Sequence, residues 1–468
     1  MVNTRSNCAS SSFVWRLLVF LLLCEMAVMI ALIIVGIKFG GAIGVGLFSL
    51  LGTVIMVVVF RLPPGNIPVV PIMIIFSIAI SAGILEAAGG LDLLVHWASQ
   101  AIKKYPAAIT FVAPLITFLF VFGVGTSNIV MSLEPVIART ALRARVRPER
   151  PLVASVLASN TALVASPAAS SALTAVGFLS GHGFSMASYM AIVIPAALLS
   201  TLLTSLFLNF WGKPLDRDPV YLERVRTGVV KETRDDDAAQ RFSRTQYAAV
   251  IGFVSAIVCV MIVGLNYDTL GHALIPGAMR DVIVDHAVTS KVTWMPATMM
   301  VQLMLYMSAV FTLVVTRIPV RSIFEAKVFT SCVTAMMSVL GPGLLGSTIF
   351  GDAGNMRVLK ENLAPLVEKA PWLVALLIAV LGMIVMSQTA TISIMFPLAL
   401  SVGVPAGFLA ALVQAVNVQY VIPALPTLLF AEEIDVTGTT NKYRAWPAGL
   451  VSTISVCAIG VALWRLIG

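Results

Sequence analysis

The stretch Gly123-Val-Gly-Thr-Ser-Asn128 interrupts a long apolar segment in the first half of this chain, and Met386-Ser-Gln-Thr-Ala-Thr391 does the same in the second half. A second polar break follows each stretch, around Pro167 and around Pro426. Backbone that leaves the helix within a membrane is tolerated only where protein or water satisfies its N–H and C=O groups. Interrupted apolar segments at corresponding places in two halves indicate a transporter's binding site. The alternative is that they are ordinary polar turns between spans.

The composition indicates a membrane protein. Hydrophobic residues make up 59% and charged residues 11% of the 468 residues, whereas a water-soluble domain carries about 25% charged residues. The formal net charge of +8 comes from bases in short loops between apolar segments. This is typical of cytoplasmic loops and does not indicate a nucleic-acid partner. The five cysteines and four histidines have no metal-binding or disulfide spacing, so we expect neither a metal site nor a cofactor.

The apolar segments divide into two halves. The basic segment 212–245 is a natural linker and separates a first half, 1–245, from a second half, 246–468. Apolar residues at helical spacing in 89–104 predict a helix on the membrane surface, and the base-poor segment 267–293 is expected outside the cell. The predicted spans are 13–36, 40–61, 66–88, 152–177, 186–211, 246–266, 296–316, 322–345, 405–432 and 446–466.

Two pairs of short apolar segments are predicted to be re-entrant hairpins. The first, about 107–140, has bases at both ends, so both ends are expected to be cytoplasmic. Its second limb, 128–140, would reach about 20 Å as a helix, too short for a hydrocarbon core of about 30 Å. The second hairpin, 371–402, then enters from outside. We therefore expect an all-α polytopic membrane protein with an inverted repeat, in which 152–177 and 405–432 are broken helices.

A series of short motifs runs in a specific order from Gly36 to Gly468. The motifs are Lys38-Phe-Gly-Gly, Pro64-Gly-Asn-Ile-Pro68, Ala88-Gly-Gly-Leu-Asp92, Val124-Gly-Thr-Ser-Asn-Ile129, Arg147-Pro-Glu-Arg-Pro-Leu152, Ala165-Ser-Pro167, Gly181-His-Gly183, Asp218-Pro-Val-Tyr221, Ser387-Gln388, Ile422-Pro423, Pro426-Thr-Leu428 and Asp435-Val-Thr-Gly-Thr-Thr440. Together they resemble the anaerobic C4-dicarboxylate transporter (Dcu) family of bacterial inner membranes. The resemblance implies exchange of fumarate, succinate, malate and aspartate. It also implies the fold of the wider ion-transporter superfamily, with paired re-entrant hairpins and elevator-like movement.

The chain departs from the family pattern close to the expected site. Glu134 stands where the family residue is usually apolar, and Ser393 stands where a Lys is common. Leu425 replaces a Tyr, and Asn160-Thr161 and Asn417 are further differences. A lost cation and a gained carboxylate leave the exact substrate and the coupling ion open.

Hydroxyl and amide side chains gather at the predicted tips and breaks. Each carboxylate of a C4-dicarboxylate needs donors, which hydroxyls, amides and the N-termini of broken helices supply. One tip per carboxylate would match a near-symmetric ligand. The alternative for any single Ser or Thr is helix packing, since small residues are enriched between membrane helices. The candidate substrate-binding residues are Thr126, Ser127, Asn128, Asn160, Thr161, Ser166, Pro167, Ser387, Gln388, Thr389, Thr391, Asn417, Pro423, Pro426 and Thr427.

Acidic residues within the apolar segments are candidates for ion coupling. Glu134 lies in the first hairpin and could carry a proton or balance a cation; the alternative is an ion pair with Arg139. Glu25 and Glu86 lie near a chain end or a span end, so we expect them to be exposed at the interface.

The sequence thus predicts a secondary transporter of C4-dicarboxylates, multi-pass in the bacterial inner membrane, that works by exchange. The alternatives are a proton- or sodium-coupled symporter of another dicarboxylate or organic anion, and a transporter doubling as a co-sensor. A membrane enzyme would need converging acids or a Ser–base pair at depth, and none is apparent, nor is a nucleotide-binding GxxxxGK[ST] motif. Beyond substrate and lipid bilayer, the candidate partners are a second copy and a membrane sensor kinase. Whether residues 1–17 belong to the mature protein stays open.

Overall fold

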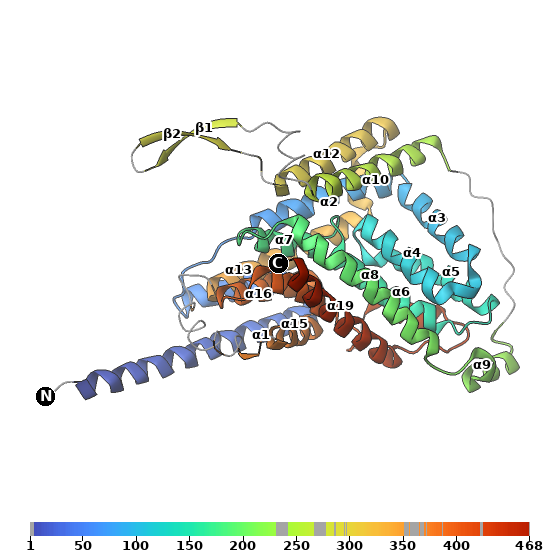
Figure 1. Ribbon diagram of the computed structural model, residues 1–468, viewed down its shortest axis with the longest axis horizontal. Helices are drawn as coiled ribbons and strands as arrows, with labels where there is room; N and C mark the ends of the chain where they lie inside the picture. Colours follow the sequence, from blue (N-terminus) through green and yellow to red (C-terminus); the bar gives the residue numbers. More distant parts are fainter. Residues whose placement is uncertain are drawn as a thin grey trace.

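Helices packed around a large apolar core form most of the described chain (Figure 1). The computed structural model describes residues 4–230, 242–265, 278–284, 287–293, 295, 297–350, 355, 365, 369–370, 372–385, 387–421 and 425–467. Within these ranges, eight helices are long and apolar enough to cross a membrane. The helices are α1 (Thr4–Val58), α2 (Val69–Ala87), α3 (Gly90–Lys104), α4 (Ile109–Val124), α5 (Val130–Arg143), α6 (Glu149–Ala165), α7 (Ser170–Ser180), α8 (Met186–Phe210), α9 (Pro219–Arg226), α10 (Arg244–Leu265), α12 (Ala297–Thr316), α13 (Lys327–Phe350), α15 (Trp372–Val385), α16 (Gln388–Ser401), α17 (Ala406–Leu412), α18 (Pro426–Ile434) and α19 (Trp446–Ile467).

Helix α1 consists of two limbs joined at Gly40 and Gly41. Gly41 has a φ of 54°, a conformation that costs a residue with a Cβ atom more than it costs glycine. The predicted spans 13–36 and 40–61 are therefore found as the two limbs of one kinked element. Helix α1 packs along α13, which also contacts α2.

The long helices pack in two groups. Helices α1, α2, α10, α12 and α13 contact one another in one group, and α4, α6, α8 and α19 contact one another in the other.

Within the first group, the Glu86 carboxylate at the end of α2 accepts hydrogen bonds from the backbone N–H groups of Lys327 and Val328, at 3.1 and 2.8 Å, where α13 begins. Glu25 is only 3% exposed and accepts a hydrogen bond from Asn355. The expected interfacial exposure of Glu25 is thus wrong, because an amide from a distant segment covers it.

Each predicted hairpin corresponds to two consecutive helices that contact each other, and their re-entrant course stays a prediction. Helices α4 and α5 are joined by a short turn that includes the 3₁₀ helix η2 (Ser127–Ile129), and α15 and α16 are joined at Ser387. The first predicted broken helix divides into α6 and α7 at residues 166–169. The second divides into α17, the 3₁₀ helix η6 (Val413–Val416) and α18. The amphipathic helix expected at 89–104 is α3, which buries Leu93 and Ile102.

One element departs from the all-α expectation. In the segment predicted as an external loop, β1 (Ala278–Val284) and β2 (Ala287–Thr293) form an antiparallel hairpin, with Ala278 opposite Thr293 and Val284 opposite Ala287. Figure 1 shows this hairpin projecting from the helical body. The strands are rich in β-branched residues, which favour extended backbone.

Candidate functional site

The tip of the first hairpin lies against the first helix break. Gly125 has a φ of 79°, and a Cβ atom built on it would lie 2.1 Å from the carbonyl oxygen of Ala168. The Ser166 hydroxyl donates to the carbonyl of Phe122 at 2.5 Å and accepts from the N–H of Ala168 at 3.0 Å. The tip and the break are therefore in direct backbone contact.

The second hairpin tip brings two helix N-termini together. The Ser387 hydroxyl caps α16 by accepting from the N–H of Ala390 at 3.3 Å. The hydroxyl of Thr389, in the first turn of α16, lies 3.3 Å from the hydroxyl of Ser170, the first residue of α7. The unpaired N–H groups of a helix's first turn carry partial positive charge. Two such ends consequently meet here, one from each half of the chain.

A line of side-chain amides also joins the two halves. The Gln388 amide nitrogen donates to the carbonyl of Asn160 at 3.1 Å and to the side-chain oxygen of Asn417 at 2.5 Å. The Asn417 amide nitrogen donates to the side-chain oxygen of Gln414 at 2.5 Å, and Gln414 donates to the carbonyl of Thr161 at 3.1 Å. We call Asn160, Ser170, Gln388, Thr389 and Asn417 the polar centre. The structure thus brings together four candidate residues with Ser170.

Gln414 was missed by the sequence analysis. It is 1% exposed and lies one helical turn before Asn417. The signal was its position three residues before a candidate Asn in a mainly apolar segment.

Other candidate residues bond within their own elements. The Thr161 hydroxyl donates to the carbonyl of Ala158, and the Thr391 hydroxyl donates to the carbonyl of Ser387. These bonds fit the packing alternative for hydroxyls in membrane helices. Thr126 and Ser127 are half-buried in the first tip, Pro167 is buried in the first break, and Asn128 belongs to η2.

The N-terminus of α18 carries an unsatisfied hydroxyl. Thr427, in its first turn, is 2% exposed, and its hydroxyl has no hydrogen-bond partner among the described residues. Pro426 opens the helix and is exposed. Pro423 lies outside the described residues. A buried hydroxyl without a partner is a donor available for a ligand.

Glu134 is completely buried on α5. Neither of its carboxylate oxygens has a hydrogen-bond partner among the described residues. The side chain of Arg139, the alternative partner, donates instead to the carbonyl of Pro135 at 3.1 Å. An isolated buried charge is very costly, so this carboxyl requires a proton or a cation that neutralises it.

Two cavities lie away from the polar centre. One, of about 430 Å³, is lined by the start of α2 and the ends of α7 and α16, including Asn66, His182 and Ser401. The other, of about 850 Å³, is mainly apolar and lies between α15, α17 and α19. None of the polar-centre residues lines either cavity. The described residues contain no group of three or more His, Cys, Asp or Glu that could hold a metal.

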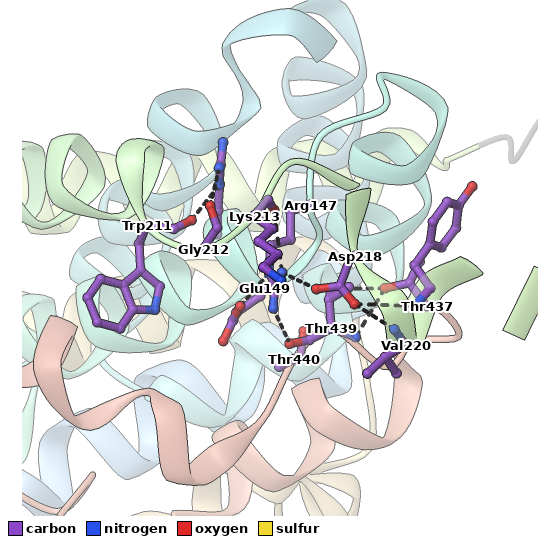
Figure 2. Close-up of polar contacts among 12 residues, drawn as sticks. Arg147, Glu149, Trp211, Gly212, Lys213, Asp218, Val220, Thr437, Thr439 and Thr440 are labelled. Carbon is purple, nitrogen blue, oxygen red and sulfur yellow. Dashed lines mark hydrogen bonds and ion pairs between the residues drawn. The ribbon is translucent and has the colours of Figure 1, made fainter. Parts of the chain in front are cut away.

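A buried ionic cluster closes one end of the second helix group (Figure 2). The guanidinium of Arg147 donates to the carboxylates of Glu149 and Asp218 and to the carbonyl of Thr439. Arg147 is 3% exposed, although sequence alone indicated an ordinary basic loop residue. We call Arg147, Glu149, Asp218 and Thr439 the arginine cluster.

The arginine cluster unites three of the sequence motifs, those beginning at Arg147, Asp218 and Asp435. The Asp435 carboxylate accepts from the backbone N–H groups of Thr437 and Thr440, at 2.9 and 2.7 Å, which shapes the turn that presents Thr439. Asp218 lies beyond the end of α8. Burial alone raises the pKa of the Asp218 carboxyl. The charge of Arg147 and the hydrogen bonds from the backbone N–H groups of Tyr221 and Val220 outweigh burial and hold this pKa below its ordinary value.

Comparison with known proteins gives concordant results. Residues 21–468 match the family model described as anaerobic C4-dicarboxylate membrane transporter. The C4-dicarboxylate transporter DcuA of Wolinella succinogenes is 31% identical over 95% of this chain and 98% of its own. DcuA of Escherichia coli K12 is 28% identical over 90% and 92%, and the anaerobic C4-dicarboxylate transporter DcuB of Escherichia coli O6:H1 is 27% identical over 86% and 88%. Among solved structures, the Alcanivorax borkumensis YdaH transporter superposes with a TM-score of 0.57 at 14% identity over 85% of both chains. The YdaH likeness confirms the mainly α-helical polytopic fold, and the inverted repeat stays a prediction.

Proposed function

Since the chain belongs to the anaerobic C4-dicarboxylate membrane transporter family, we propose that it moves fumarate, succinate, malate and aspartate by exchange. Membership makes it a multi-pass transporter of the bacterial inner membrane and not an enzyme. The exchange mode and these individual substrates are the proposal.

The observation that carries the proposal is the meeting of the N-termini of α7 and α16. Their first turns are linked by the contact between Ser170 and Thr389. Helix N-termini favour anions through their N–H groups and dipole, and discontinuous helices near the midplane supply such ends in transporters. This geometry supports a binding site for one substrate carboxylate.

The second carboxylate is assigned to the N-terminus of α18. Thr427 offers a buried hydroxyl without a partner among the described residues. Hydroxyl and backbone N–H donors carry no formal charge, which favours release of the substrate as well as binding. The remaining candidate residues at the tips and breaks line this proposed site or shape its backbone.

Movement is proposed to follow the division of the helices into two groups. The two hairpins and the two broken helices, residues 107–177 and 371–432, move as a unit in this proposal. Helices α8 and α19 pack on α4, α6 and α17, so we include them in the moving unit and take α1, α2, α10, α12 and α13 as the scaffold. The inverted repeat and the elevator movement belong to this proposal, which fits alternating access by one bundle moving against another.

A second candidate, proton-coupled symport, is favoured by Glu134. Its buried carboxyl without a partner needs neutralisation, and a proton bound there would travel with the first hairpin. Glu134→Gln should retain dicarboxylate binding and abolish stimulation by an imposed pH gradient. Equal stimulation in the wild type and the variant would remove Glu134 from coupling.

Exchange can be tested in proteoliposomes. Vesicles loaded with unlabelled succinate should take up external radiolabelled succinate rapidly, whereas empty vesicles should not. Thr427→Val, which keeps the shape, should weaken substrate affinity by about tenfold, the effect of losing one hydrogen bond to a charged group. Uptake that is independent of internal dicarboxylate would contradict exchange. Membrane cross-linking would test the proposed homodimer and sensor-kinase partners.

A further inference from the structure

Both ends of the amide line are backbone carbonyl groups, which can only accept hydrogen bonds. At one end, the Thr161 carbonyl accepts a hydrogen bond from the NH2 group of Gln414. At the other end, the Asn160 carbonyl accepts one from the NH2 group of Gln388. A side-chain amide places its oxygen and its NH2 group on opposite branches. Fixing one branch therefore fixes the other.

This constraint sets the polarity of every amide in the line. Because Gln414 donates to Thr161, its oxygen accepts from Asn417, whose own oxygen then accepts from Gln388. The NH2 group of Gln388 has two hydrogens, and its two acceptors, Asn160 and Asn417, use both. The Gln388 side chain has no donor left for a substrate carboxylate.

The Gln388 side-chain oxygen is, in contrast, available. It accepts no hydrogen bond from the described residues and is not sealed from solvent. Gln388 is the first residue of α16 and directly follows the capping residue Ser387. The next residue, Thr389, places its hydroxyl next to Ser170 at the N-terminus of α7. Donors for a carboxylate and an acceptor for a neighbouring group thus occur side by side.

We propose that Gln388 is a specificity-determining residue that accepts a hydrogen bond from a hydroxyl or ammonium group on C2 of the C4-dicarboxylate. Gln414 is a positioning residue: it fixes the orientation of Asn417, which together with the Asn160 carbonyl holds the Gln388 amide. C4-dicarboxylates with such a donor are bound more tightly than those without one, because an amide oxygen facing a CH2 group loses its hydration without replacement. This inference rests on the proposed function.

The test compares malate with succinate, which differ only by the C2 hydroxyl group. Binding to the purified full-length protein in detergent is measured by calorimetry. The wild type should prefer malate by about tenfold, the effect of one satisfied hydrogen bond. Gln388→Met should remove this preference mainly by weakening malate binding. Gln414→Leu should also reduce the ratio, since Asn417 can then turn its NH2 group toward Gln388, which leaves the bond to the Asn160 carbonyl alone to hold the Gln388 amide. Gln419→Leu, a buried neighbour outside the line, should leave the ratio unchanged.

The outcomes separate the two levels of the proposal. If neither dicarboxylate binds the wild type, the proposed function fails. If both bind but the wild type shows no preference for malate, the specificity inference is overturned and the function stands. A parallel loss of malate and succinate affinity in Gln388→Met would make this residue structural. If Gln388→Met does not fold, the ratio in Gln414→Leu decides: an unchanged ratio overturns the inference.

Discussion

Replacing Arg147 with alanine should destabilise the protein strongly. The Arg147 side chain is 3% exposed, and its carboxylate partners on Glu149 and Asp218 are 2% and 7% exposed. Removing the guanidinium leaves two buried carboxylates without their cation. Breaking a buried ion pair in this way costs about 3–5 kcal/mol. Asp218 retains the backbone N–H groups of Val220 and Tyr221, so most of the cost falls on Glu149.

The matched control is Arg226→Ala. Arg226 pairs with Glu223 at 3.1 Å on the nearby helix α9, with both side chains largely exposed at 79% and 56%. Its loss should cost about 1 kcal/mol or less. The free energy of unfolding is measured in mixed micelles by titration with sodium dodecyl sulfate, followed by tryptophan fluorescence. The variant carrying Arg147→Met, Glu149→Gln and Asp218→Asn should recover part of the loss, since no buried charge remains in the cluster. If Arg147→Ala costs no more than Arg226→Ala, the arginine cluster does not support the fold.

Three further predictions concern the first tip, the topology and the pH dependence. Gly125→Ala should shift the first tip and weaken dicarboxylate binding, because residue 125 has a φ of 79° and an added Cβ would meet the Ala168 carbonyl. The control Gly123→Ala should be tolerated, since open space surrounds the added Cβ. Equal dicarboxylate binding by both variants would contradict this role of Gly125. In a cysteine-free background, a membrane-impermeant thiol reagent applied from outside should label a cysteine at His182 and spare one at Arg145; the reverse pattern would invert the topology. The lowered pKa of Asp218 means that its stabilising contribution is present above its unfolded pKa of about 3.8 and is lost as the pH falls through the lower folded value. Asp218→Asn should therefore flatten the acid limb of the stability curve below about pH 4, and an unchanged limb would exclude this role.

The helix ends at the predicted tips and breaks were predictable because their signals are local. A polar stretch within an apolar segment, such as Gly123–Asn128, marks the departure from the helix wherever the rest of the chain folds. Charge placement and limb length then favoured a hairpin over a span, and this interpretation stays a prediction. The side of the membrane from which each hairpin enters stays a prediction.

The contacts within the polar centre were less accessible to sequence analysis. The bond between Gln388 and Asn160 joins residues 228 positions apart, and nothing local selects this pair over another. The Gln388 side chain was expected to donate to the substrate, and the structure shows both hydrogens of its NH2 group used within the protein. Which amide donates and which accepts depends on the two backbone carbonyls at the ends of the amide line. Only the folded chain determines which carbonyls these are.

Arg147 illustrates a different limit. A loop with several arginines predicts a cytoplasmic position, and this pattern is the same whether a given arginine is solvated or buried. The burial of Arg147 depends on Asp218 and Thr439, which arrive from remote segments. The β1–β2 hairpin was missed because the base-poor segment was considered for its charge and not for its β-branched residues.

The arginine cluster also imposes an order on biosynthesis. Thr439 follows Arg147 by 292 residues, and at a synthesis rate of about 5–20 residues per second this corresponds to about 15–60 s. Asp218, only 71 residues after Arg147, becomes available much sooner, so the charge of the arginine is balanced while the second half is still on the ribosome. The turn that carries Thr439 then adds a hydrogen bond to the ion pair that Arg147 and Asp218 have already formed. The nascent first half can consequently be inserted into the membrane with Arg147 already neutralised by Asp218. The hydrogen bond from Arg147 to Thr439 forms only after most of the second half has been synthesised.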